Sequence, residues 1–229
     1  MSLAERYASV RQRIASAARK SGRSEADVNL IVITKMHPVD VAAELYDLGH
    51  RVFGENKDQE AAPKASALAA LGKADASWHF VGQLQSNKAK SVIRYADCIH
   101  SIDRSSLVSE LSKQLEKNDQ RIQGFIELNL TDDPGRGGVQ PAHLLELAEK
   151  VIAAERIEVL GVMAVAGLGV DPRVDFERAI AASMKLRTLV PSADQLSLGM
   201  SEDFEAAIEL GATHVRIGSA ITGPRQISA

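Results

Sequence analysis

The chain has a single cysteine, Cys98, and no marked excess of charge of either sign. One cysteine excludes an intramolecular disulfide framework, and no Cys/His cluster has zinc-finger spacing, so we expect a reducing, cytoplasmic setting and no metal site. The 27 Lys and Arg residues against 30 Asp and Glu residues give a net charge of -3. This balance offers no basic footprint for nucleic acid or for an anionic membrane.

Long apolar runs are also missing. None approaches the roughly 20 residues that are needed to span a bilayer. The N-terminal stretch alternates charged and small apolar residues at helical spacing, without the apolar core of a signal peptide. We therefore expect a soluble protein with neither a membrane nor a nucleic acid as its partner.

Short apolar or β-branched runs recur along the chain, and each precedes a stretch with helical periodicity. The eight runs are residues 30–34, 51–53, 79–81, 98–102, 124–130, 159–165, 195–198 and 214–217. The predicted helices are residues 39–48, 58–71, 105–117, 141–154, 175–190 and 202–210, with one more before the first strand. This alternation indicates a parallel sheet covered by helices.

The number of β/α units separates two folds. Eight units in about 200 residues match a small (β/α)8 TIM barrel, whereas an open doubly wound sheet more often has about five to seven strands. A chain of 229 residues with 45% hydrophobic residues holds one substantial core. We therefore predict an α/β fold, a (β/α)8 barrel with an extra N-terminal helix, as one domain over residues 1–229. The longest loops are expected at residues 131–138 and 167–173.

Barrel enzymes and binding proteins place their functional residues after the C-terminal ends of the strands. Lys35 directly follows the first run, and period-two alternation puts Ile31, Ile33 and Lys35 on one face. Burial there disfavours the ammonium form and frees the amine for imine formation with an aldehyde. The alternative is a solvated lysine that ends a strand.

The second run is followed by Glu55 and Asn56 after a glycine, where both side chains can orient a ligand at the mouth. Their alternative role is turn chemistry and an N-cap for the next helix.

Two segments near the C-terminus suit a phosphate group. Ser201 precedes an amphipathic run and is a predicted N-cap, and the last strand delivers Gly218 and Ser219 to the same mouth, with Arg216 pointing inward. Barrels commonly bind phosphate after strands seven and eight. A plain helix cap and a plain turn glycine remain the alternatives.

Cys98 and His100 share one face of the fourth strand, a spacing that invites a thiolate–imidazole interpretation. Both lie within an apolar strand, where a free cysteine usually acts as a small hydrophobic residue. His79, in the third strand, is similarly interpreted as a core histidine satisfied by a neighbour.

Several blocks in order closely resemble the pyridoxal-phosphate homeostasis protein family over nearly the whole chain. They are Val32-Ile33-Thr34-Lys35, Phe53-Gly54-Glu55-Asn56, the segment from Trp78 to Lys88, Leu198-Gly199-Met200-Ser201 and Val215-Arg216-Ile217-Gly218. The family is similar in fold to the barrel domain of alanine racemases.

The resemblance implies that pyridoxal 5'-phosphate (PLP) is the cofactor. It implies a Schiff base on Lys35, with Ser201, Gly218 and Ser219 around the phosphate and Asn56 and Arg216 near the ring. An arginine facing the pyridine nitrogen would disfavour its protonation, which makes the cofactor a poorer electron sink.

The resemblance further implies a monomeric carrier that delivers PLP to PLP-dependent apoenzymes or buffers its level, with no catalytic residue. Two departures from the family pattern stand out: Arg136 replaces the usual lysine in the loop after strand five, and the segment from Gly161 to Gly167 lacks a common proline.

Two enzymatic alternatives stay open: a PLP-dependent amino-acid racemase or lyase, and a cofactor-free Schiff-base aldolase that uses Lys35 on a phosphosugar. Racemases append a C-terminal β domain that supplies a tyrosine acid/base, for which this chain leaves no room. Its three tyrosines, Tyr7, Tyr46 and Tyr95, fall in predicted helices.

Overall fold

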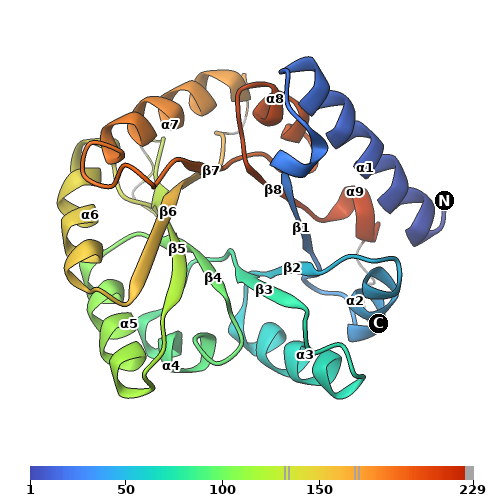
Figure 1. Ribbon diagram of the computed structural model, residues 1–229, viewed down its shortest axis with the longest axis horizontal. Coiled ribbons are helices and arrows are strands. Elements are labelled where there is room, and N and C mark those ends of the chain that lie inside the picture. Colours follow the sequence, from blue (N-terminus) through green and yellow to red (C-terminus); the bar gives the residue numbers. More distant parts are fainter. Residues whose placement is uncertain (132, 134, 168, 170, 225–229) are drawn as a thin grey trace.

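Eight parallel strands close into a barrel in the order of the sequence, with β1 pairing with both β2 and β8 (Figure 1). The computed structural model describes residues 1–131, 133, 135–167, 169 and 171–224. The strands are β1 (Asn29–Ile33), β2 (Val52–Glu55), β3 (Ser77–Phe80), β4 (Cys98–Ile102), β5 (Ile122–Leu128), β6 (Ile157–Ala164), β7 (Gln195–Ser197) and β8 (His214–Ile217). The predicted α/β barrel is therefore confirmed.

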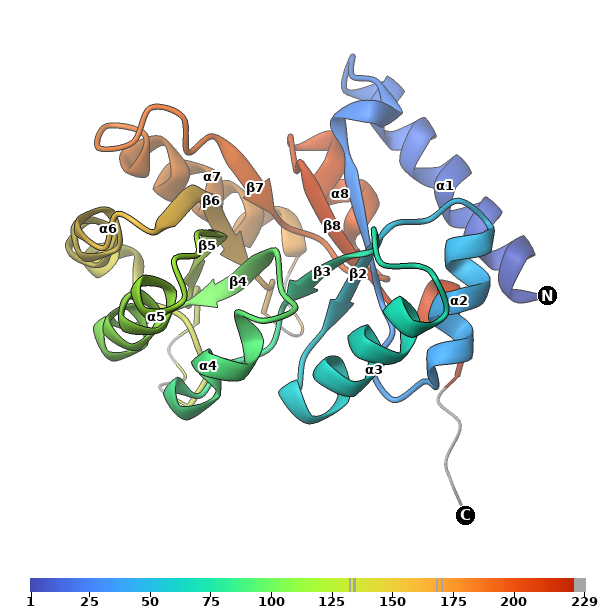
Figure 2. The same cartoon turned by 60° about the horizontal axis from the view of Figure 1, so that its bottom comes forward.

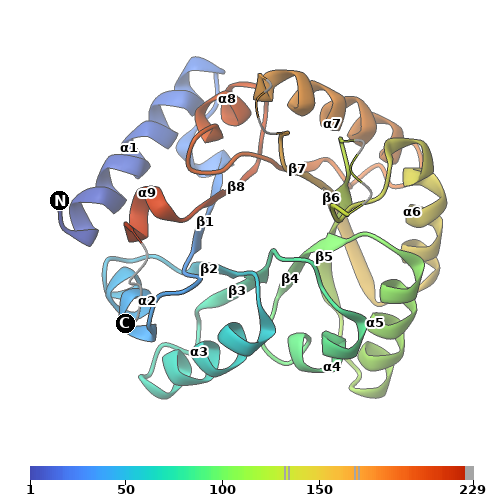
Figure 3. The same ribbon diagram turned by 180° about the vertical axis from the view of Figure 1, so that it is seen from behind.

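Helices form a ring outside the strands, as seen from both ends of the barrel (Figures 1 and 3). They are α1 (Leu3–Lys20), α2 (Val39–Asp47), α3 (Asp58–Ala70), α4 (Ala89–Val92), α5 (Ser105–Lys117), α6 (Leu144–Ala153), α7 (Pro172–Leu186), α8 (Phe204–Glu209) and α9 (Ser219–Thr222). Short 3-10 turns occur at Glu25–Asp27, Ser86–Lys88 and Pro141–His143. Within the described residues, none of the helices is both long enough and apolar enough to cross a bilayer.

The N-terminal helix α1 packs beside α8 and α9 (Figure 1). A capping box fixes its first turn, because Ser2 Oγ accepts the Glu5 amide while the Glu5 side chain accepts the Ser2 amide. Arg6 Nε donates to the carbonyl oxygen of Ile221 at 2.6 Å. Helix α1 thus supports the segment that follows the last strand.

The hydrophobic core has two parts. Strand residues that face outward, such as Val32 and Phe53, pack with the helices in one large buried cluster. Inside the barrel, Cys98 and Phe125 pack with Leu160 and Met163 in a second, smaller cluster. The rest of the interior combines apolar residues such as Ile31 with several polar side chains, which are unusual in a fold whose interior is usually filled by branched aliphatic residues.

Several predicted boundaries were wrong. The helix predicted over 202–210 begins only at Phe204, so Ser201 lies in a turn and the N-cap is Asp203. The loop predicted over 167–173 ends earlier, because Pro172 and Arg173 open α7. Four residues of these two predicted loops, 132, 134, 168 and 170, lie outside the described residues. Tyr95 lies in the turn after α4 rather than in a helix.

Candidate functional site

A pocket of about 440 Å³ opens at the C-terminal ends of the strands, which all run in the same direction around the barrel (Figure 2). Its volume falls within the roughly 300–1,000 Å³ of typical ligand sites. The structure brings all six predicted binding residues into its lining: Lys35, Asn56, Ser201, Arg216, Gly218 and Ser219.

Lys35 is half-buried at the mouth, two residues after the end of β1. The next residue, Met36, has a φ of 61°, which is unfavourable for a side chain larger than glycine. A hydrogen bond compensates for this conformation, because the Met36 amide donates to Glu60 Oε2 on α3 at 2.7 Å. The carboxylate therefore holds the sharp turn that ends the strand at the lysine.

Arg216 lies beneath the pocket as a buried cation. Its guanidinium donates to the carbonyl oxygen of Ser197 at 2.7 Å, to Ser197 Oγ at 2.5 Å and to the carbonyl oxygen of Ala164 at 2.9 Å. Burial lowers the pKa of Arg216 to about 10, so it stays charged at neutral pH. Among the described residues, no carboxylate forms an ion pair with it, which leaves a positive charge facing the pocket.

The Ser201 hydroxyl accepts hydrogen bonds from the segment that follows β8. Its Oγ accepts the amide of Gly218 at 3.3 Å and that of Ala220 at 3.4 Å, and lies 3.3 Å from Ser219 Oγ. The turn that carries Ser201 is closed by Asp203, whose Oδ1 accepts the Met200 amide at 2.6 Å. Converging amides and hydroxyls of this kind suit an anion.

Close backbone packing positions Asn56 at the pocket wall. A Cβ on Gly82 would lie 2.1 Å from the main-chain oxygen of Asn56, so only glycine fits there. Asn56 and Gly82 follow β2 and β3, and both line the pocket.

Glu55 does not reach the mouth, contrary to the sequence-based prediction. It is fully buried outside the barrel, where it forms an ion pair with Lys64 of α3 and accepts the Thr34 hydroxyl at 2.7 Å. Lys64 also donates to the carbonyl oxygen of Thr34 at 2.8 Å. Glu55 therefore fastens α3 to the first two strands.

Two residues near the pocket were missed by sequence analysis. His37 lines the pocket, and its pKa is lowered by burial and by the charges of Lys64 and Arg6. Its spacing of two from Lys35 was the available signal. Glu127 of β5 lies inside the barrel near Arg216, and burial raises its pKa to about 7.

Arg136, the residue that replaces the family's lysine, does not line the pocket. Its guanidinium donates to the carbonyl oxygens of Val165 and Ala166, both at 3.1 Å. It therefore ties the loop after β5 to the loop after β6.

Hydrogen bonds in the barrel interior join residues from three strands, β3, β4 and β7. His79 Nδ1 lies 2.8 Å from His100 Nε2, and His100 Nδ1 lies 2.8 Å from Ser197 Oγ. His79 therefore has the neighbour that its interpretation as a satisfied core histidine required. Cys98 is fully buried, and burial raises the pKa of its thiol well above the usual value, as expected for an unreactive cysteine.

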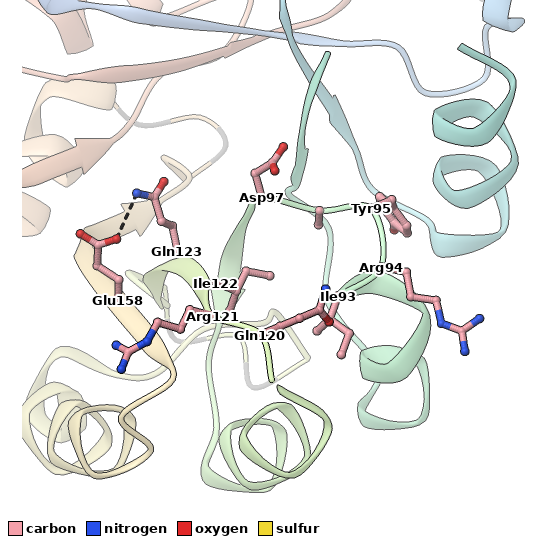
Figure 4. Close-up of a pocket in the computed structure, with 10 residues that line it drawn as sticks. Ile93, Arg94, Tyr95, Asp97, Gln120, Arg121, Ile122, Gln123 and Glu158 are labelled. Carbon is pink, nitrogen blue, oxygen red and sulfur yellow. Dashed lines mark hydrogen bonds between the residues drawn. The ribbon is translucent and has the colours of Figure 1, made fainter. Parts of the chain in front are cut away.

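A second hollow, of about 590 Å³, lies at the opposite end of the barrel (Figure 4). Its lining comes from the N-terminal ends of β4, β5 and β6, where Gln123 Nε2 donates to Glu158 Oε2 at 3.1 Å. It contains none of the predicted site residues. Although it is larger, this end of a barrel generally serves stability, so the C-terminal pocket is the candidate site.

Comparison with known proteins agrees with this architecture. The family model described as "Alanine racemase, N-terminal domain" matches residues 6–226. The pyridoxal phosphate homeostasis protein of Escherichia coli (strain K12) is 39% identical over 99% of this chain and 98% of its own.

Solved structures extend the comparison. PipY of Synechococcus elongatus, solved with PLP bound, has a TM-score of 0.84 and 31% identity, covering 96% of this chain and 99% of its own. Alanine racemase of Corynebacterium glutamicum shares the fold, with a TM-score of 0.66 and 18% identity over 96% of this chain and 61% of its own. The chain thus belongs to the pyridoxal phosphate homeostasis protein family, whose barrel is that of the alanine racemase N-terminal domain.

Proposed function

We propose that this protein binds PLP as a Schiff base on Lys35 and delivers or buffers it for PLP-dependent apoenzymes, without significant catalysis. The observation that carries the proposal is the convergence of Lys35, Arg216 and the Ser201–Gly218–Ser219 donor group in one pocket of about 440 Å³. PLP carries an aldehyde, an aromatic nitrogen and a phosphate. The Lys35 amine suits the aldehyde, the Arg216 cation suits the aromatic nitrogen, and the donor group suits the phosphate. PLP bound to PipY, which is 31% identical, supports the same ligand here.

The described residues fit this ligand. Lys35 would hold it covalently, while Ser201 Oγ, the Gly218 amide and Ser219 Oγ would receive the phosphate. Asn56 and Arg216 would lie near the ring. PLP supplies an electron sink for carbanion chemistry when its ring nitrogen is protonated. The charge of Arg216 opposes that protonation, which favours storage over turnover.

The placement of acid/base groups also favours a carrier over a two-base racemase. No tyrosine is found among the described residues that line the pocket. The Tyr7 hydroxyl lies 3.3 Å from His50 Nδ1, and the Tyr46 hydroxyl donates to Asp75. Tyr95 lines the hollow at the opposite end of the barrel. The side chains of the lining that can move a proton are instead His37, Glu202 and Asp203, and Asp203 already accepts the Met200 amide.

Uptake of PLP by the apoprotein tests the binding half of the proposal. We expect one equivalent to bind and to produce a visible absorption band. Lys35→Ala should abolish the band, whereas Lys90→Ala on α4, an exposed lysine outside the pocket, should leave it unchanged. An unchanged band in Lys35→Ala would contradict the assignment.

Assays of PLP transfer and of catalytic turnover test the second half of the proposal, that the protein delivers PLP without significant catalysis. The loaded protein should activate an apoenzyme while leaving the α-proton of amino acids unexchanged in deuterated water. Rapid exchange that is lost in His37→Gln would instead establish a racemase or lyase. A protein that takes up no PLP but reacts with phosphosugars through Lys35 would establish the aldolase.

A further inference from the structure

Three soft or borderline metal ligands meet inside the barrel, away from the PLP pocket. We call His79, Cys98 and His100 the lumen triad. One ligand atom from each lies within 4.8 Å of the other two. Cys98 and His100 are fully buried, and His79 retains some exposed surface. None of the three lines the pocket that holds Lys35, so the proposed function leaves them without a role.

The histidines present their nitrogens toward one another. His79 Nδ1 and His100 Nε2 lie 2.8 Å apart. The other nitrogen of His100, Nδ1, lies 2.8 Å from Ser197 Oγ. A metal-bound histidine almost always donates its second ring N–H to an oxygen, which fixes the ring and its tautomer. Ser197 is therefore already in place to orient His100 as a ligand.

We propose that the lumen triad binds one Cu(I) ion through His79 Nδ1, His100 Nε2 and Cys98 Sγ. Two imidazoles and one thiolate in a trigonal arrangement are the donor set of copper sites, often with a methionine nearby. Met163 packs with Cys98 in the same buried cluster, so a methionine sulfur is present beside the proposed site.

Charge distinguishes Cu(I) from Zn(II) in this interior. Binding converts the Cys98 thiol to a thiolate and releases one proton to solvent. A Cu(I)–thiolate unit is then neutral, whereas Zn(II) would leave a net positive charge near the buried Arg216. Zn(II) also usually takes a fourth ligand in structural sites.

The two histidines must move apart to hold an ion. Two nitrogens bound to one ion at about 2.0 Å lie roughly 3.3–3.5 Å apart, so the 2.8 Å separation must widen by about half an ångström. Rotation of the partly exposed His79 ring can supply this movement.

The test is an anaerobic titration of the full chain with Cu(I) against a coloured Cu(I) chelator. We expect one equivalent to bind, with affinity lowered about 100-fold or more in Cys98→Ser and about 10- to 100-fold in His79→Gln. His143→Gln removes a histidine whose side chain is 69% exposed and should bind as the unaltered protein does. Unchanged affinity in Cys98→Ser, or no stoichiometric uptake, would overturn the proposal.

X-ray absorption of the copper-loaded, unaltered protein keeps the test decisive if an interior variant fails to fold. We expect one sulfur and two nitrogen neighbours around copper. A first shell of nitrogen and oxygen alone would place the ion elsewhere and refute the site, as would displacement of Cu(I) by equimolar Zn(II).

Discussion

Arg216 and Ser197 are joined by two hydrogen bonds, because the guanidinium donates to both the carbonyl oxygen and the hydroxyl oxygen of the serine. The same hydroxyl contacts His100 Nδ1 at 2.8 Å. One serine thus connects the cation beneath the PLP pocket to the histidines of the barrel interior.

Loss of this hydroxyl should destabilise the protein. Ser197→Ala removes one acceptor of the Arg216 guanidinium, which keeps its main-chain acceptors, and leaves His100 Nδ1 without a partner. We expect this to cost about 1–3 kcal/mol of unfolding free energy. Ser101 is equally buried, but its hydroxyl has no partner among the described residues, so Ser101→Ala should be neutral or slightly stabilising. Urea unfolding of both variants measures the difference. Equal losses would mean that the Ser197 hydrogen bonds contribute nothing.

Acid should weaken the fold between pH 7 and pH 5. Burial lowers the pKa of His50 and His79 to about 4 and that of His214 to about 3. The unfolded chain binds protons at these histidines near pH 6.5 while the folded chain does not, so each contributes a loss of about 2 kcal/mol at pH 5. Glu127 opposes this trend, since its folded pKa of about 7 favours the native state as pH falls.

These four groups together give an expected loss of about 4 kcal/mol between pH 7 and pH 5, measurable by urea unfolding at both values. His214→Gln should reduce the loss by about 2 kcal/mol, and Glu127→Gln should increase it. A protein as stable at pH 5 as at pH 7, with His214→Gln changing nothing, would contradict the lowered histidine pKa values.

The ion pair between Lys64 and Glu55 should matter far more than a surface pair. Lys64→Met leaves a fully buried carboxyl group without its cation, at an expected cost of about 3–5 kcal/mol. Lys150→Met breaks an exposed pair with Glu146 and should cost less than about 1 kcal/mol. Adding Glu55→Gln to Lys64→Met should recover part of the loss. Thermal or urea unfolding checks all three, and similar losses for both lysines would contradict the account.

Gly82→Ala should weaken PLP binding. The new methyl group would lie 2.1 Å from the main-chain oxygen of Asn56 and must displace the pocket wall. Gly22→Ala is the control, because its φ of 71° disfavours a side chain but no atom lies within 4 Å of the added carbon, so it can cost stability without disturbing the pocket. We expect a lower affinity for PLP in Gly82→Ala alone, measured by absorbance titration. Equal affinities would show that Asn56 does not depend on this contact.

Patterns local to each strand predicted much of this structure. Eight apolar runs sufficed for the barrel, and period-two alternation correctly brought Lys35 and Arg216 to one mouth. Glu55 was misplaced because its partner, Lys64, comes from the following helix and draws the carboxylate outward. Ser201 lines the pocket as predicted but does not cap α8, because an additional turn, closed by Asp203, delays the start of that helix.

Contacts between strands were beyond the reach of sequence patterns. His79 and Cys98 are register partners on β3 and β4, and Ser197 meets His100 from across the barrel. The spacing of these residues along the chain does not predict the contacts, because the contacts form only when the sheet closes into a barrel. The polar interior therefore emerged only from the structure.

Reduction of the PLP-loaded protein with borohydride, followed by peptide mass mapping, tests the central claim most directly. The account predicts one phosphopyridoxyl group per chain, on the peptide that contains Lys35. Recovery of the label on another lysine, or scattered labelling that persists in Lys35→Ala, would contradict it.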